Sequence, residues 1–569
     1  MGAREKLQLE KYTLDHFFER VVTLYAHTTS IGLVGQTPIT YAELGEQVAQ
    51  LQAELRERGL KYQDKVVILG ISTANWAIAY LAVTTMGAVA VPVMDEFPEA
   101  DVEHILGHSE ATAIFIDDSL YQSLNLPSLD TISIVVKLDD FSFTGKKSDP
   151  AANIRSHLPD KIKQSLANED EAETIQEDDL AEILYTSGTT GHSKGVMLTH
   201  KNLATNLLTG PDIFDFLNED SVALGILPLA HSFGLNTTLL AMISVGATVY
   251  YLDGKPSPKV LMKAMQAVRP HAMGAVPLIF EKIYQRQVLP AINGNAAFRL
   301  MVKVPPLKRL LHKLIGKKVM EAFGGRIQGF FIGGASLNQE IEHFMQAAGI
   351  PYSCGYGLSE CAPIVTGAKL EVIKTGSVGP TVKDVTVKID KPDPETGIGE
   401  ILIKGPNVMQ GYYRNQAATD AVFTEDGWLI TGDRGCLDAD NFLYIKGRSK
   451  NMILGPSGEN IFPEVIEDKL KESVFVEEAL VYQLDKKLTA RIYPNYTYIE
   501  TMQKSKSQEE VVLAADIVQI LEGVRVDTNT RLPSFSQIQQ IVEQTAPFIK
   551  TPTNKIKRGE YIPDYFTNH

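Results

Sequence analysis

Apolar runs alternate with helix-like segments along most of the chain. After Lys65 the sequence predicts a strand (KVVILGI), a helix over residues 75–86, a strand (AVAVPV), a helix over 101–109 and a strand (ATAIFID). A second round contains the apolar runs SVALGIL, GATVYYL, HAMGAV and GFFIGG, separated by helical segments such as 258–268 and 338–348. Such alternation predicts parallel sheets with helices on both faces. We therefore expect a large α/β body of two doubly wound subdomains.

The pattern changes after Gly379. Short β-type runs such as TVKID and EILIKG alternate there with turns rich in Gly, Pro and Asp, which predicts a small antiparallel subdomain over about residues 380–449. From Lys450, strand-like and helix-like segments alternate again. The sequence thus predicts an N-terminal domain over residues 1–449, which includes the small β subdomain, and a small α+β C-terminal domain over residues 450–569.

One uncharged stretch, residues 72–94, approaches the length of a membrane-spanning helix. Asn75, Gly87 and Pro92 interrupt it, and its composition changes from helical to β-rich at Gly87. A buried helix that leads into a buried strand explains this pattern better than a membrane span.

Composition limits the classes of function. The 569 residues exceed what one hydrophobic core usually holds. With 54 basic and 69 acidic residues the formal charge is -15, which argues against nucleic acid as the main partner. Cys354, Cys361 and Cys436 offer neither a disulfide framework nor CxxC metal spacing, and the charged N-terminus lacks the apolar segment of a secretory signal. We therefore expect a cytoplasmic location.

The stretch 181–200, AEILYTSGTTGHSKGVMLTH, is the strongest candidate for chemistry. Its first residues suit a buried strand, and hydroxyl residues and glycines follow before Lys194. Glycines let backbone N–H groups approach phosphate oxygens, hydroxyls donate hydrogen bonds, and the lysine adds a positive charge. This is not a Walker A loop, because Gly195 stands where a hydroxyl residue would bind magnesium. On spacing alone, a phosphate cradle and a Ser/Gly-rich surface loop are equally good interpretations.

The full string YTSGTTGHSKGVMLTH resembles the phosphate-loop signature of the adenylate-forming superfamily, which includes acyl-CoA synthetases, firefly-type luciferases and peptide-synthetase adenylation domains. Further motifs follow in the family's order, namely PLAHSFGL, GYGLSE, TGD with a later GR, PSGEN and TPTNKIKR. They are most similar to those of long-chain fatty acid:CoA ligases, and the resemblance covers essentially the whole chain. The residues it implies around the ATP phosphates are Thr186, Ser187, Gly188, Thr189, Thr190, Gly191 and Lys194.

The resemblance also implies how the rest of the nucleotide is bound. Glu360, by itself an ordinary carboxylate, corresponds to the ligand of Mg2+, and Ser359 to a hydroxyl that donates to the phosphate. Asp433 corresponds to the acceptor for the ribose hydroxyls, and Arg448 to a second ribose or phosphate contact. The residues implied around the adenine are Gly334, Ala335, Tyr356 and Gly357.

Three further residues are implied in the chemistry. His231 lies in the family segment beside the acyl and adenylate sites, although a lone histidine is more often structural. Lys555 matches the catalytic lysine of the terminal motif, and Gly458 lies in a loop that enters the site for thioester formation. In the family the small C-terminal domain is mobile and turns about the position of Lys450.

The reaction implied by the resemblance is ATP-dependent activation of a carboxylic acid to an acyl adenylate, followed by transfer to CoA with release of AMP. Two departures from the family pattern, Ser193 for a proline and Asn554 for a glycine, remove no reactive group. Transfer to an acyl carrier protein stays open. A non-catalytic adenylate-binding protein is disfavoured because the key side chains are retained, namely Lys194, Glu360, Asp433 and Lys555.

The segment 280–325 is similar to the insertion of long-chain ligases and points to a medium- to long-chain fatty acid. Within it, residues 299–320 (RLMVKVPPLKRLLHKLIGKKVM) are basic and amphipathic. A helix of this kind fits the surface of an anionic membrane, and it fits equally a solvated helix that packs on the body. Both interpretations stay open.

Overall fold

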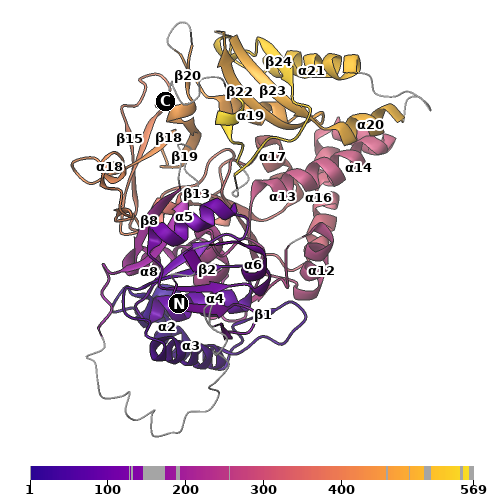
Figure 1. Ribbon diagram of the computed structural model, residues 1–569. Coiled ribbons are helices and arrows are strands. Elements are labelled where there is room, and N and C mark those ends of the chain that lie inside the picture. Colours follow the sequence, from indigo (N-terminus) through magenta and orange to yellow (C-terminus); the bar gives the residue numbers. More distant parts are fainter. Residues whose placement is uncertain are drawn as a thin grey trace.

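The computed structural model describes residues 2–126, 128–129, 132–144, 173–186, 193–255, 257–455, 459–485, 487–504, 514–551 and 555–562. Within these residues, two large sheets covered by helices form the body of the chain, drawn from indigo to magenta in Figure 1. The predicted α/β class with two wound units is confirmed.

An eight-stranded sheet of the described residues has the order β17-β8-β7-β3-β2-β4-β5-β6. The strands from β7 to β5 are parallel, whereas β8 and β6 run antiparallel to their neighbours. The phosphate-loop stretch supplies β7 and β8. The bounds are β2 Lys65–Leu69, β3 Val89–Val93, β4 Ala113–Ile116, β5 Ile134–Lys137, β6 Phe143–Thr144, β7 Leu180–Thr186, β8 Lys194–Thr199 and β17 Gly411–Tyr412.

A second sheet has seven strands in the described part, in the order β1-β10-β9-β11-β12-β13-β14. All neighbours are parallel except β13 and β14. The predicted apolar runs account for β9 to β12. The bounds are β1 Ile31–Leu33, β9 Val222–Gly225, β10 Thr248–Tyr251, β11 Ala272–Ala275, β12 Gly329–Ile332, β13 Tyr352–Gly357 and β14 Ile364–Gly367.

The uncharged stretch 72–94 is a buried helix followed by a buried strand, as predicted. Helix α4 (Ala74–Thr85) begins after Thr73, whose hydroxyl accepts a hydrogen bond from the Trp76 N–H. The rings of Trp76 and Tyr80 are fully buried and stack 5.7 Å apart. Among the described residues, no helix has the length and apolarity to cross a membrane.

The predicted helices differ from the observed ones by a residue or two at their ends. Helix α17 starts one residue later than predicted because Asn338 caps it, with its side-chain oxygen accepting from the N–H groups of Glu340 and Ile341. The helices used below are α5 Glu99–Ser109, α12 Pro258–Val268, α13 Pro277–Ile283, α15 Ala296–Val302, α16 Pro305–Ala322 and α17 Gln339–Ala348.

A small antiparallel sheet follows the body, as the short β-type runs and turns of the sequence predict. Its strands are β15 (Thr386–Asp390), β16 (Gly399–Lys404), β18 (Leu429–Leu437) and β19 (Leu443–Arg448). Residues 453–562, called here the C-terminal module, contain β22 (Val476–Leu484), β23 (Lys487–Pro494), β24 (Gln540–Glu543), α19 (Pro463–Lys471), α20 (Tyr496–Lys504) and α21 (Ala514–Asn529).

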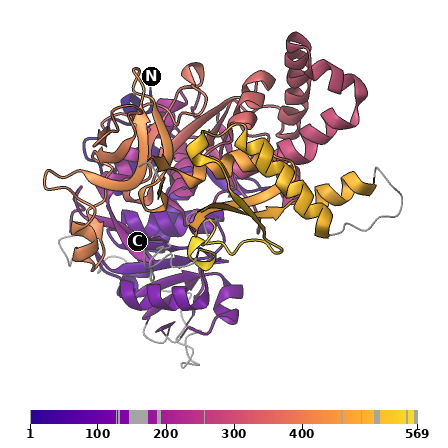
Figure 2. The same cartoon turned by 90° about the horizontal axis from the view of Figure 1, so that it is seen from above.

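The C-terminal module has its own apolar core between α19, α21 and its sheet, which includes Leu470, Val481, Ala490 and Leu521. In Figures 1 and 2 the module, in yellow, lies against one side of the body, next to the helices that precede and follow β12. The exact limits of the two domains stay a prediction.

Candidate active site

The predicted phosphate loop connects two strands of the eight-stranded sheet. Thr186 ends β7, Lys194 begins β8, and these two residues are cross-strand partners. The intervening loop residues lie outside the described residues, and their role stays a prediction; they are Ser187, Gly188, Thr189, Thr190 and Gly191. The hairpin places both ends of this loop at one edge of the sheet.

Tyr412 joins Lys194 to Glu360, a connection that the sequence did not predict. The Lys194 ammonium lies 4.9 Å from the centre of the Tyr412 ring, and the Tyr412 hydroxyl donates to Glu360 Oε1 over 2.9 Å. Burial, and then the charge of Glu360, raise the pKa of Tyr412, so the phenol stays protonated. Tyr412 reaches this place because β17 pairs with β8, at Tyr412 opposite Val196. The GYY string gives no local sign of that pairing.

Glu360 fits a cation that needs few protein ligands. Among the described residues there is no group of three or more His, Cys, Asp or Glu side chains arranged to hold a metal ion. A single carboxylate suits Mg2+, which is usually bound through one or two carboxylates plus phosphates and water. The Tyr412 hydroxyl uses one carboxylate oxygen and thereby fixes the orientation of the group. Glu360 is therefore suited to Mg2+ bound together with nucleotide phosphates.

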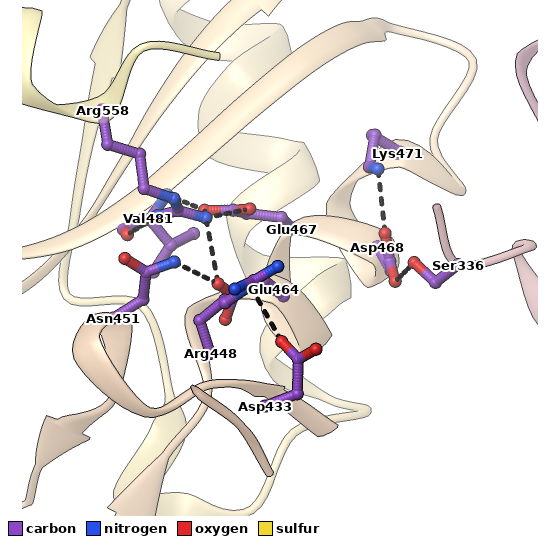
Figure 3. Close-up of polar contacts among 10 residues, drawn as sticks. All are labelled: Ser336, Asp433, Arg448, Asn451, Glu464, Glu467, Asp468, Lys471, Val481 and Arg558. Carbon is purple, nitrogen blue, oxygen red and sulfur yellow. Dashed lines mark hydrogen bonds and ion pairs between the residues drawn. The ribbon is translucent and has the colours of Figure 1, made fainter. Parts of the chain in front are cut away.

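Asp433 is held between an aromatic and a basic side chain. The Tyr356 hydroxyl donates to Asp433 Oδ2 over 2.7 Å. Arg448 Nε lies 2.8 Å from Asp433 Oδ1 (Figure 3). Asp433 and Arg448 are cross-strand partners on β18 and β19. Asp433 is buried, whereas 44% of the Arg448 side chain is exposed. The two oxygens of Asp433 retain further lone pairs, so the carboxylate can also accept from a diol.

The motifs predicted around the adenine leave the seven-stranded sheet at one edge, because β12 and β13 are parallel neighbours. Gly334 and Ala335 follow β12 in an exposed turn, and Gly334 has a φ of +88°, which favours glycine. Gly357 permits a close approach of two segments, since a Cβ there would lie 2.1 Å from the Pro363 carbonyl oxygen. Ser359 begins the short helix that carries Glu360.

His231 caps the short helix Ser232–Leu235. Its Nδ1 accepts a hydrogen bond from the Phe233 N–H over 3.2 Å, so in the neutral ring Nε2 carries the proton. Burial, and then the positive charge of Lys555, lower the pKa of His231 to about 4. His231 is therefore a neutral hydrogen-bond donor at pH 7, and it lies within the electrostatic reach of the terminal lysine.

Lys555 brings the C-terminal module to the same place. Lys555 is exposed to solvent, yet desolvation by nearby protein atoms and then the positive charge of Arg448 lower its pKa. The negative charges of Asp433 and Glu360 act in the opposite direction. The Thr551 N–H donates to the Lys555 carbonyl over 2.8 Å. Residues from four distant segments thus lie within electrostatic reach of one another.

Arg558 fixes this terminal segment to the rest of the module. Its Nη2 donates to both carboxylate oxygens of Glu467 at 2.7 Å, and its Nη1 donates to the Val481 carbonyl over 3.2 Å (Figure 3). Glu464 lies 3.7 Å from the same guanidinium and accepts from Asn451 over 2.5 Å. The sequence alone did not predict a role for Arg558, although its place in TPTNKIKR is a possible signal.

A family model described as "AMP-binding enzyme" matches residues 18–413. The chain belongs to the AMP-binding enzyme family. Its relatives in this family include the long-chain-fatty-acid-CoA ligase FadD15 of Mycobacterium bovis, which is 30% identical over 78% of this chain and 75% of its own length. Long chain acyl-CoA synthetase 1 of Arabidopsis thaliana is 27% identical over 92% of this chain and 86% of its own length.

Solved structures share the fold of this AMP-binding enzyme. The anthranilate CoA ligase AuaEII in complex with anthranoyl-AMP has a TM-score of 0.76 at 19% identity, covering 100% of this chain and 99% of its own. ATP-bound MatB from Rhodopseudomonas palustris has a TM-score of 0.72 at 23% identity, covering 96% and 98%. The family and the curated relatives make the chain an AMP-forming acid-CoA ligase, as the resemblance predicted.

Proposed function

We propose that the chain activates a medium- to long-chain fatty acid with Mg-ATP and transfers the acyl group to CoA. The observation that carries this proposal is that Lys555 lies within electrostatic reach of His231, Glu360 and the Asp433–Arg448 pair. That set holds a carboxylate for a ribose, a carboxylate for a cation and a mobile positive charge. Relatives named as long-chain fatty acid ligases support the substrate class.

In the first half-reaction, an oxygen of the fatty acid carboxylate attacks the α-phosphorus of ATP, the bond to the β-phosphate oxygen breaks, and pyrophosphate leaves. Lys555 lies where it can reduce the repulsion between the attacking carboxylate and the phosphate, and His231 Nε2–H can donate to an oxygen of the forming mixed anhydride. Glu360 would hold Mg2+, which supplies charge neutralisation on the phosphates when bound. Asp433 would accept from the ribose hydroxyls.

In the second half-reaction, the CoA sulfur attacks the acyl carbonyl and AMP leaves. We expect the C-terminal module to turn about Lys450, which lies two residues after β19, so that Lys555 withdraws and another surface of the module meets the adenylate. Gly458 belongs to the loop proposed for this step, and it lies outside the described residues.

A small apolar cavity of about 20 Å³ lies beside the helical segment that follows His231, and it would have to widen to admit an acyl chain. Thr237, Ala241 and Met242 line it from the helical segment that follows His231, and further walls come from the seven-stranded sheet, including Gly274 and Phe331. A Cβ on Gly274 would lie 2.7 Å from Thr237 Oγ1, so the glycine keeps this space open. Apolar lining with few polar atoms is what an alkyl chain requires.

The exposed residues of helices α15 and α16 support the proposal that this part of the protein binds an anionic membrane surface. Leu300, Leu307, Leu310 and Leu314 are 41% to 65% exposed. Basic residues flank these leucines in an acidic protein, namely Lys303, Lys308, Arg309, Lys313, Lys317 and Lys318. Leu311 and Val319, by contrast, pack on the body. The helix thus uses one face for packing and presents the other to solvent.

Charge reversal tests this membrane contact. Replacement of Lys308, Arg309 and Lys313 by Glu should weaken binding to vesicles that contain anionic lipid, measured by co-sedimentation at low salt. The matched control reverses three exposed lysines on other elements, Lys11, Lys383 and Lys391. Equal loss in both triple variants would show a general charge effect, and unchanged binding in the first would refute the contact.

The activity itself is tested by AMP formation from ATP and Mg2+ with acids from acetate to oleate, each with free CoA, with a holo acyl carrier protein, or with neither. We expect stoichiometric AMP and acyl-CoA with the longer acids and CoA. Discharge only by the carrier protein would identify the other acceptor, and preference for acetate would refute the substrate class. Lys555→Ala should abolish adenylation yet spare thioester formation from supplied acyl adenylate.

A further inference from the structure

The C-terminal module contacts the body through Asp468 of α19, the residue that follows Glu467. Ser336 Oγ donates to Asp468 Oδ2 over 2.7 Å (Figure 3). Asn338 Nδ2 donates to the Asp468 carbonyl over 3.2 Å. Ser336 directly follows the Gly334-Ala335 turn of the body, and Asn338 caps α17. One helix of the module is thereby joined to the turn predicted to lie at the adenine.

Lys471, one turn along α19, lies between carboxylates of the two parts. Its Nζ is 2.8 Å from Asp468 Oδ1 on the same helix. Burial works against its charge, but Asp468 and then Glu281, on α13 of the body, raise the pKa of Lys471. A cavity between the two parts is lined by Glu281, Asn338 and Lys471, among others. The lysine therefore holds two acidic groups together that would otherwise repel one another.

Glu467, the neighbour of Asp468 on α19, determines where Lys555 lies. Glu467 binds Arg558 with both oxygens, and Arg558 lies three residues after Lys555. Because the fork of the guanidinium also holds the Val481 carbonyl on β22, the terminal segment, α19 and the sheet of the module move together. A shift of α19 relative to Ser336 must then shift Lys555 relative to Glu360 and Asp433.

We propose that Asp468 is a positioning residue for the adenylation step: its contact with Ser336, Asn338 and Lys471 holds the C-terminal module in the orientation that presents Lys555. We call this set the Asp468 contact. The proposal rests on the proposed two-step function and specifies how one of its two orientations is stabilised. When the module turns about Lys450, the Asp468 contact opens, so it stabilises adenylation and opposes the thioester step.

The test compares the two half-reactions in the full chain. Asp468→Ala and Ser336→Ala should each lower the rate of acyl adenylate formation from palmitate and Mg-ATP about three- to tenfold, the population shift expected for one solvated, charge-assisted hydrogen bond. Thioester formation from supplied palmitoyl adenylate and CoA should be unchanged or faster. The double variant should lose no more than the Asp468 variant, because both substitutions remove one interaction.

Asp527→Ala is the matched control. Asp527 is also a carboxylate of the module that pairs with a cation one turn along, Arg531 at 3.0 Å. It should leave both half-reactions unchanged. Equal loss of both half-reactions in Asp468→Ala, or additive losses in the double variant, would overturn the proposal. If the unmodified protein forms no acyl adenylate from any acid, the proposed function itself is refuted. If the unmodified protein is active and the Asp468 variant is equally active, only the role of Asp468 is refuted.

Discussion

Arg558 gives a prediction whose size can be worked out from the structure. The Arg558 and Glu467 side chains are 13% and 11% exposed, and they pair through two hydrogen bonds of 2.7 Å. Removing one member of a buried ion pair costs about 3–5 kcal/mol, because the other charge is left uncompensated. Here some water reaches both groups, and the Val481 N–H still donates to Glu467 over 2.7 Å. We therefore expect Arg558→Ala to lower the unfolding free energy of the C-terminal module by about 3 kcal/mol.

Hydrogen exchange measured by mass spectrometry reports this loss in the full chain. A change of about 1.4 kcal/mol is a factor of ten, so protection over residues 463–484 should fall roughly 100-fold. The double variant Arg558→Met with Glu467→Gln is the matched control, since the glutamine still accepts from Val481 and no charge is left alone. It should recover most of the protection. Equal loss in the single and the double variant would refute the reasoning.

The same variant has a pH dependence of known sign. Burial raises the pKa of Glu467 above its usual range, and Arg558 acts against this rise. Without Arg558 the pKa of Glu467 in the folded state rises further. Its contribution to the stability of the variant is therefore greatest below the ordinary carboxyl pKa of about 4.5, and it is lost as pH rises through the raised pKa. The defect of Arg558→Ala should therefore be larger at pH 8 than at pH 5.

Three further predictions use other groups. Burial raises the pKa of Glu182 to about 7, so wild-type stability should fall between about pH 4.5 and pH 7. Glu182→Gln escapes this loss and should show a relative gain of about 3 kcal/mol in urea unfolding at pH 8. Because the pKa of His231 is about 4, the adenylation rate should show no ionisation of His231 between pH 5 and pH 8. Because the pKa of Lys555 is lowered, the rate should decline at alkaline pH, beginning below pH 10.5. Lys555→Arg should move this alkaline decline to higher pH. Tyr412→Phe keeps the ring near Lys194 but loses the hydrogen bond to Glu360, and should raise the KM for Mg-ATP about three- to tenfold with an unchanged melting temperature.

Local pattern was enough to predict the layered body. The helices expected at 75–86, 101–109 and 258–268 appear as α4, α5 and α12, with shifts of at most two residues at their ends. Each lies between apolar runs short enough for strands, so period and length together decide the element type. The stretch 72–94 was assigned to the core for the same reason, and Trp76 and Tyr80 are buried there.

The contacts within the site could not be predicted in this way. Tyr412 reaches Glu360 only because an edge strand of two residues pairs with β8, and neither string carries that information. Tyr356 was expected beside the adenine, but the direction of its hydroxyl onto Asp433 depends on how the seven-stranded sheet meets β18. Motifs identify which side chains are available, whereas register and the packing of separate sheets decide which of them touch.

The contacts of Glu467 and of Asp468 lead to different expectations for a variant, because the first hold the module together and the second join it to the body. Arg558 and Glu467 lie within the C-terminal module, so their loss loosens the module in either orientation and should impair both half-reactions. The Ser336 and Asp468 side chains belong to different parts of the molecule, so their loss shifts the balance between orientations while the module stays folded. A reduced adenylation rate with full hydrogen-exchange protection over residues 463–484 would therefore mark an orientation defect, and the same rate with lost protection would mark a folding defect.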